Sequence, residues 1–82
     1  MLTPSKYDCI AILSAAERVS STDEVVRLSY QKLGLSLNSL DAAAAFLMER
    51  GCFVRCSGAH GDYEIGRLSQ QGKWRLEQLV HG

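Results

Sequence analysis

Apolar residues recur every three or four positions in four stretches of the chain, and this spacing predicts four helices. The first is predicted to begin at Thr3-Pro4, a cap residue followed by a proline suited to the first helical position, and to end near Arg18. We expect Cys9 and Ile12 on this helix to be core or interface residues. Its apolar members are Tyr7, Ile10, Ala11, Leu13, Ala15 and Ala16.

A second helix is predicted to begin at Ser21, because Ser21 and Glu24 have the three-residue separation of a capping box. It should continue to Leu33, where Gly34 ends it in a tight turn directly before the next helix. Two helices joined so closely must cross at a steep angle, which predicts a helix-turn-helix. Its inward face is predicted to contain Val25, Val26, Leu28, Ser29 and Leu33, and its outward face Arg27, Gln31 and Lys32.

The third helix is predicted to be capped by Ser36 or Asn38 and to end at Glu49-Arg50, before Gly51. Its expected core positions follow the helical spacing and are Leu40, Ala43, Ala44 and Leu47. Beyond Gly51 the apolar residues alternate with polar ones. This predicts a two-stranded hairpin with strands at 52–56 and 63–65 and a turn at 57–62.

The last helix is predicted to be capped by Ser69, with Gly72 in its first turn. Its apolar members are Trp74, Leu76, Leu79 and Val80. We expect Trp74, the only tryptophan, to lie in the core, and the alternative is that it anchors a second subunit. Together the elements predict an α+β protein, mostly α-helical, with one domain spanning residues 1–82.

Four motifs follow one another at defined separations: Leu33-Gly34-Leu35-Ser36, then Leu40 and Leu47, then Glu49-Arg50-Gly51, then Leu68-Ser69-Gln70-Gln71-Gly72-Lys73. In this order they resemble the winged helix-turn-helix of MarR- and PadR-type bacterial regulators. The resemblance implies a three-helix core, a two-stranded β wing and a C-terminal helix. It also implies a small transcriptional regulator that binds double-stranded DNA as a homodimer.

In that family the third helix lies in the major groove of DNA. The resemblance therefore implies DNA contacts from the exposed face of this helix, formed by Leu37, Asn38, Ser39, Asp41, Ala42 and Ala45. Asn38 and Ser39 carry the donors and acceptors that recognise base edges, and an asparagine suits adenine. The implied backbone contacts are Arg55, His60 and Arg67 of the wing together with Arg27 and Lys32. For His60 the alternative is a solvated loop residue without a function.

The charge of the chain argues for a second function. Nine basic and nine acidic residues leave no formal net charge, whereas a DNA-binding surface is as a rule basic. The exposed face of the third helix is small, apolar and mildly acidic. The alternative is therefore a winged helix that binds another protein, as an adaptor or inhibitor, through Leu37, Asp41 and Ala45.

Composition excludes several other classes. At 46% hydrophobic and 22% charged residues, the chain is ordinary soluble material. Because no apolar stretch approaches the roughly 20 residues that cross a bilayer, we expect a cytoplasmic protein without membrane contact. Cys9, Cys52 and Cys56 cannot all pair within the chain, so we expect free thiols in a reducing compartment. A metal site built on Cys52, Cys56 and His60 is not expected, because it lacks a fourth ligand. No catalytic motif surrounds the histidines or serines, so neither enzymatic activity nor a cofactor is predicted.

Overall fold

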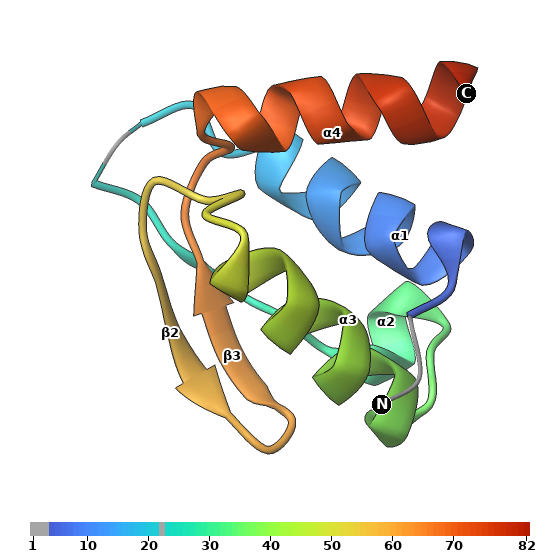
Figure 1. Cartoon of the computed structure of the whole chain (residues 1–82). Coiled ribbons are helices and arrows are strands. Elements are labelled where there is room, and N and C mark those ends of the chain that lie inside the picture. The colour runs from blue at the N-terminus through green and yellow to red at the C-terminus, as the bar shows by residue number, and fades with distance from the viewer. Residues whose placement is uncertain (1–3, 22) are drawn as a thin grey trace.

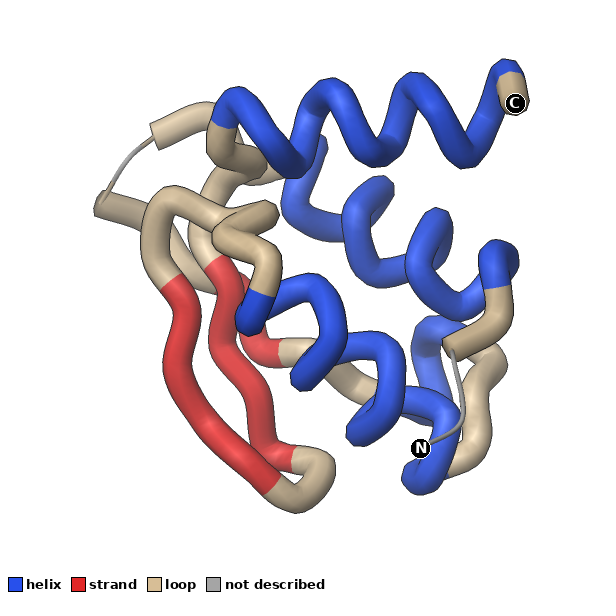
Figure 2. Tube along the Cα trace, in the orientation of Figure 1, coloured by secondary structure: helices blue, strands red, loops and turns tan. Residues whose placement is uncertain are grey.

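The computed structural model describes residues 4–21 and 23–82, and about half of the chain is helical (Figures 1 and 2). The elements in chain order are α1 (Lys6–Glu17), β1 (Val26–Arg27), α2 (Tyr30–Leu33), α3 (Leu37–Glu49), β2 (Cys56–Ala59), β3 (Asp62–Ile65) and α4 (Gln70–His81). The strands form an antiparallel sheet in the order β1-β3-β2. Within the described ranges, no helix has the length and apolar character needed to cross a membrane.

Helix α1 begins later than the sequence predicts. Its N-cap is Ser5, whose hydroxyl oxygen accepts the amide N–H of Tyr7 at 3.2 Å, so Pro4 precedes the cap instead of opening the helix. The predicted cap Thr3 lies outside the described residues. The predicted end is confirmed, because Arg18 is the C-cap residue. Cys9 and Ile12 are buried, as expected.

The predicted second helix is wrong over most of its length. Ser21 accepts the amide of Asp23 at 3.2 Å, but no helix follows, and the chain instead forms β1. Val26 pairs with Ile65 of β3, which shows why the strand forms. A β-branched residue such as Val26 fits an extended conformation, and the edge of β3 supplies its backbone hydrogen-bond partners. Because β3 is distant in the sequence, the capping pattern at Ser21 gives no indication of this pairing. Only Tyr30–Leu33 remains helical, capped by Ser29.

The connection from α2 to α3 agrees with the sequence. Gly34 has a left-handed backbone with φ 74°, and Ser36 caps α3 by accepting the amide of Ser39 at 3.1 Å. At the other end of α3, Gly51 has φ 67°, also left-handed. The four predicted core residues of α3 are all buried: Leu40, Ala43, Ala44 and Leu47.

The hairpin is shifted toward its tip relative to the prediction. Strand β2 begins at Cys56, whereas Phe53 forms an isolated bridge with Leu68 outside the sheet. The turn contains two residues, His60 and Gly61, with φ values of 53° and 84°. Positive φ at both central positions is the requirement of a type I′ turn, which suits the twist of antiparallel strands. The predicted six-residue turn is wrong because 58–59 pairs with 62–63.

Helix α4 begins as predicted, since Ser69 accepts the amide of Gly72 at 3.1 Å. Helix α1 lies between α4 and α3 (Figure 1), and the buried side chains of all three helices join those of the sheet in one core. The predicted burial of Trp74 is wrong, because its side chain is 60% exposed. Gly72 and Leu76 are the buried residues of α4, and Trp74, two residues from each, lies about 200° around the helix from both.

All three cysteines are free thiols, as predicted. Cys9 and Cys52 are buried, and Cys56 is half-buried. Burial raises the pKa of each thiol above its ordinary value, so all three stay protonated at neutral pH. Among residues 4–21 and 23–82, no group of three His, Cys, Asp or Glu side chains is placed to hold a metal ion.

Candidate nucleic-acid interface

The N-terminal end of α3 and the tip of the β2–β3 hairpin meet at one end of the molecule, away from α4 (Figure 1). The contact is made by Leu37, whose side chain occupies the space that a Cβ atom at Gly61 would fill. Glycine at this position therefore allows the turn to approach the helix. Leu37 remains 45% exposed, so it lies at the boundary between this contact and solvent.

The exposed polar side chain in the N-terminal half of α3 that could recognise a base is that of Asn38. Asn38, Ala42 and Ala45 are exposed, and Asn38 and Ala42 are one helical turn apart. Ser39 is half-buried, and its hydroxyl accepts the hydroxyl of the cap residue Ser36 at 2.9 Å. The side-chain amide of Asn38 makes no hydrogen bond to any other described residue. It can present both a donor and an acceptor to a ligand.

Asp41 is half-buried on α3 and forms a hydrogen bond with the hairpin. The hydroxyl of Tyr63 donates a hydrogen bond to its carboxylate at 2.8 Å, across 22 positions of sequence. Tyr63 itself is only 4% exposed. Burial raises the pKa of the Tyr63 hydroxyl, and the hydrogen bond and negative charge of Asp41 raise this pKa further. Asp41 is half-buried, and through this hydrogen bond it holds α3 against β3.

The predicted phosphate contact Arg27 lies on β1 beside the hairpin. Its Nε atom is 3.3 Å from a carboxylate oxygen of Asp62, the first residue of β3, and both side chains are 71% exposed. An exposed ion pair contributes about 0 to 1 kcal/mol, so it can exchange for another anion at little cost. At the same time Asp62 neutralises much of the positive charge that Arg27 brings to this end of the molecule.

The remaining predicted cations do not all gather at this end. Lys32 is exposed on α2, and Figure 1 shows α2 and the hairpin on either side of α3. His60 is exposed at the tip of the hairpin, where its positive φ is part of the turn. Arg55 precedes β2 at the open end of the hairpin, where its carbonyl accepts the amide of Gly66 at 2.6 Å. The structure thus separates Arg55 from His60, which the sequence had grouped in one wing.

A second group of cations lies at the opposite end of α3, and sequence patterns gave no indication of it. The guanidinium carbon of Arg50 is 3.7 Å from the centre of the Phe46 ring, and that of Arg75 is 5.7 Å from the same centre. Such stacking is typical of cation–π contacts. Arg75 comes from α4, so only the packing of the helices brings the two cations together.

Comparison of the chain with protein-family models, with curated proteins and with solved structures gives no match. Function is therefore inferred from the residues and contacts of this chain alone.

Proposed function

We propose that this chain is a winged helix-turn-helix protein that binds double-stranded DNA and regulates transcription, with α3 in the major groove. The observation that carries the proposal is the exposed N-terminal half of α3, with the free amide of Asn38, directly beside the hairpin tip. The element order and the sheet order β1-β3-β2 support it, because a winged helix has a strand before its helix-turn-helix and a hairpin after it.

The proposed contacts divide into base recognition and phosphate binding. The major groove is about 12 Å wide and admits one α-helix. Asn38 would donate to and accept from an adenine edge, and the methyl groups of Leu37 and Ala42 would pack against thymine. Lys32, His60 and Arg27 would bind phosphates on either side of the groove. Ser39 has its hydroxyl engaged with Ser36, so we assign it to positioning the helix end.

The same geometry implies that electrostatic attraction between this protein and DNA phosphates is weak. The chain has no formal net charge, and Asp62 partly neutralises Arg27. With about two to three cations near phosphates, non-specific affinity should be low and should depend only modestly on salt. Base contacts would then supply most of the discrimination between DNA sequences.

Two substitutions separate base recognition from phosphate binding. Asn38→Ala should reduce the preference for the best duplex selected from a random pool by about 1 to 3 kcal/mol, because the bidentate contact is lost. Lys32→Ala should weaken binding to all duplexes by a similar factor. Arg18→Ala is the matched control, since Arg18 is exposed at the C-cap of α1 and not on α3 or the hairpin. Equal loss of affinity in all three variants would contradict the assignment.

The second candidate function is binding of another protein through the same face of α3. It is favoured by the composition of that face, where Leu37, Ala42 and Ala45 are exposed and uncharged. The Asp41 carboxylate beside this face is held by the hydroxyl of Tyr63. Apolar centres with little charge are typical of protein interfaces. If this second function is correct, the protein does not bind duplex DNA even at low salt. In that case Leu37→Asp abolishes binding of the partner protein.

A further inference from the structure

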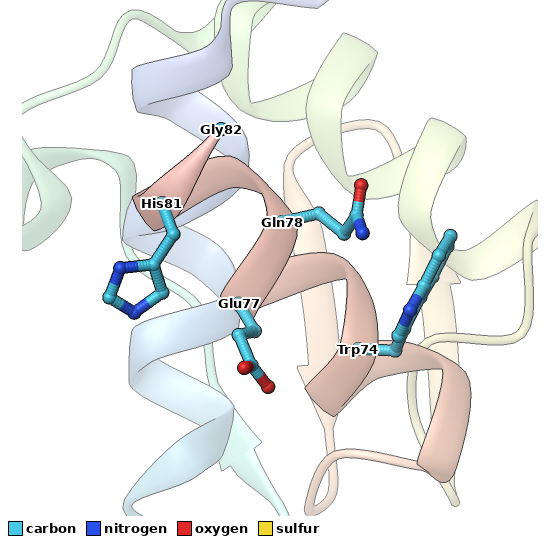
Figure 3. Close-up of a pocket in the computed structure, with 5 residues that line it drawn as sticks. All are labelled: Trp74, Glu77, Gln78, His81 and Gly82. Atoms are coloured by element: carbon cyan, nitrogen blue, oxygen red, sulfur yellow. The ribbon is translucent and has the colours of Figure 1, made fainter.

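One flank of α4 combines an exposed indole ring with positive charge. Trp74 is 60% exposed, and Figure 3 shows it on the same side of the helix as Gln78, whereas Glu77 and His81 lie on the other side. A shallow hollow of about 470 Å³ runs along the side with Trp74. No acidic side chain lines this hollow. Its lining residues are Lys6, Trp74, Arg75, Gln78, Leu79 and Gly82.

Arg75 connects the hollow to a third cation, which lies at the end of α3. The guanidinium carbon of Arg75 is 5.7 Å from the centre of the Phe46 ring, and that of the exposed Arg50 is 3.7 Å from the same centre. Attraction to the ring favours these positions for both guanidinium groups, so they lose less freedom when they bind an anion. We call the surface formed by Lys6, Arg50, Trp74 and Arg75 the basic flank.

The three cations of the basic flank have no carboxylate partner in the described part of the chain. In residues 4–21 and 23–82, the ion pair closer than 4.0 Å is that of Arg27 with Asp62, beside the hairpin. Each cation of the flank is therefore farther than this from Asp8, from Glu49 and from the terminal carboxylate of Gly82. Positive charge is gathered here although the chain has no formal net charge, and it is available to an external anion.

We propose that the basic flank binds a short acidic segment of another protein, with an apolar side chain of that segment packed on Trp74. Charge complementarity selects an acidic occupant, because the planar guanidinium of an arginine can donate two parallel hydrogen bonds to one carboxylate. Clusters of arginines recognise acidic motifs in other complexes. The indole of Trp74 and the half-buried Leu79 supply an apolar centre that excludes water from these contacts.

The limited extent of the basic flank favours a peptide over a strand of nucleic acid. Glu17 and Glu77 line a second hollow between α1 and α4, together with Lys73, so the positive surface does not continue around α4. A single strand binds through cations along several nucleotides and through successive bases stacked on aromatic rings. Trp74 is the aromatic residue that lines the hollow of the basic flank. One anchor with charges beside it suits a short peptide.

The basic flank is separate from the candidate DNA-binding end. Figure 1 shows α4 on one side of the molecule, and the hairpin tip with the N-terminal end of α3 on the opposite side. Peptide binding therefore does not rest on the proposed function. Asn38→Ala should leave peptide affinity unchanged, so the two proposals can fail separately.

Titration with a defined peptide tests the proposal. The probe is a soluble synthetic peptide of about ten residues that combines glutamates with leucines, and the control peptide carries lysine in place of each glutamate. Because Trp74 is the only tryptophan, its fluorescence should shift to shorter wavelength as the acidic peptide covers it. We expect a dissociation constant of about 10 to 500 µM at low salt, as for a small contact, and no binding of the lysine peptide.

Two results of this titration would overturn the proposal. One is the absence of binding by the acidic peptide at low salt. The other is tighter binding of single-stranded oligothymidine than of the acidic peptide, which would identify the basic flank as a nucleic-acid surface instead.

Substitutions inside and outside the basic flank locate the contact. Lys6→Gln and Arg50→Gln should each weaken binding of the acidic peptide about three- to tenfold, because each removes one charge contact. Arg18→Gln and Lys32→Gln are the matched controls, since they remove exposed cations elsewhere, and they should change the affinity by less than about twofold. Equal losses in all four variants would show that general charge attracts the peptide and would contradict the proposed contact.

Trp74→Ala tests the apolar anchor. Calorimetric titration should show peptide binding weakened by about tenfold or more, because a tryptophan at the centre of a contact contributes much of its affinity. Circular dichroism should be unchanged, since the side chain is 60% exposed and adds little to the core. Full affinity in this variant would exclude the indole from the contact. Arg75 is left unaltered because its guanidinium also lies near the Phe46 ring, between α4 and α3.

Discussion

At the scale of single residues, the contact between Tyr63 and Asp41 determines what α3 presents to solvent. The hydroxyl of Tyr63 donates to the Asp41 carboxylate at 2.8 Å from a side chain that is almost fully buried. The hydrogen bond fixes the direction of a half-buried acidic side chain on α3. Its direction matters for either proposed function, because a carboxylate repels phosphate and is unfavourable inside an apolar contact.

Tyr63→Phe tests the energetic role of this contact. The variant should lose about 1 to 2 kcal/mol of unfolding free energy at neutral pH, because a hydrogen bond to a charged acceptor is removed while the ring stays buried. Urea unfolding followed by circular dichroism measures the loss. Tyr7→Phe is the matched control, since Tyr7 is 78% exposed, and it should change stability by less than about 0.5 kcal/mol.

The difference between wild type and Tyr63→Phe should also depend on pH. The pKa of Tyr63 is raised above 10.0 in the folded protein, so at alkaline pH the unfolded chain loses this proton first. The stability that Tyr63 contributes is therefore complete below about pH 10 and falls as pH rises further. The pKa values of the cysteine thiols are also raised in the folded state, but this contribution is the same in wild type and in Tyr63→Phe and cancels in the difference. A constant difference from pH 7 to 11 would contradict this account.

At the scale of elements, the sequence predicted several helix ends that are encoded locally, although Pro4 does not open α1 and no helix follows Ser21. Ser36 and Ser69 cap the following helices with their own hydroxyl oxygens, and Gly34 takes the left-handed conformation that only a few residues tolerate. Each of these signals involves residues within one turn of each other. They could be recognised without knowing what packs against the helix.

Elements that depend on distant partners were not predicted. Strand β1 forms because β3, nearly 40 positions later in the chain, has an open edge, and its local sequence resembles the start of a helix. Trp74 was assigned to the core because large aromatics are usually buried, but the positions of Gly72 and Leu76 decide which face of α4 is inside. The sequence placed Asn38 and Ala42 on the exposed side of α3, whereas the Asp41–Tyr63 and Arg27–Asp62 contacts required the fold.

Gly72→Ala tests the close approach of α4 to the loop after α3. A methyl group at this position would collide with the backbone carbonyl of Cys52, which also accepts the amide of Ser69 at 2.9 Å. Because backbone cannot move aside cheaply, we expect a loss of about 1 to 3 kcal/mol, despite the usual helix-favouring gain of about 1 kcal/mol for alanine. Gln71→Ala on the exposed neighbouring position should be neutral or slightly stabilising in the same urea titration.

At the scale of the whole molecule, charge is balanced overall but unevenly placed. Arg50 and Arg75 both lie near the Phe46 ring at the C-terminal end of α3. The opposite end, with Asn38 and the hairpin tip, has few unpaired cations, because Arg27 is paired with Asp62. A DNA-binding domain of this kind would rely on base contacts more than on general attraction to phosphate. Its affinity for random DNA should therefore be low, and its salt dependence shallow.

The most direct test of DNA binding is titration of the protein against the best duplex from a random pool at about 50 and 200 mM salt. With two to three phosphate contacts per chain, affinity should fall by about 10- to 40-fold between the two conditions. Asn38→Ala should remove the preference for the selected duplex at both salt concentrations. Absence of binding at the lower salt concentration would contradict the proposed function and favour a protein partner on the exposed face of α3.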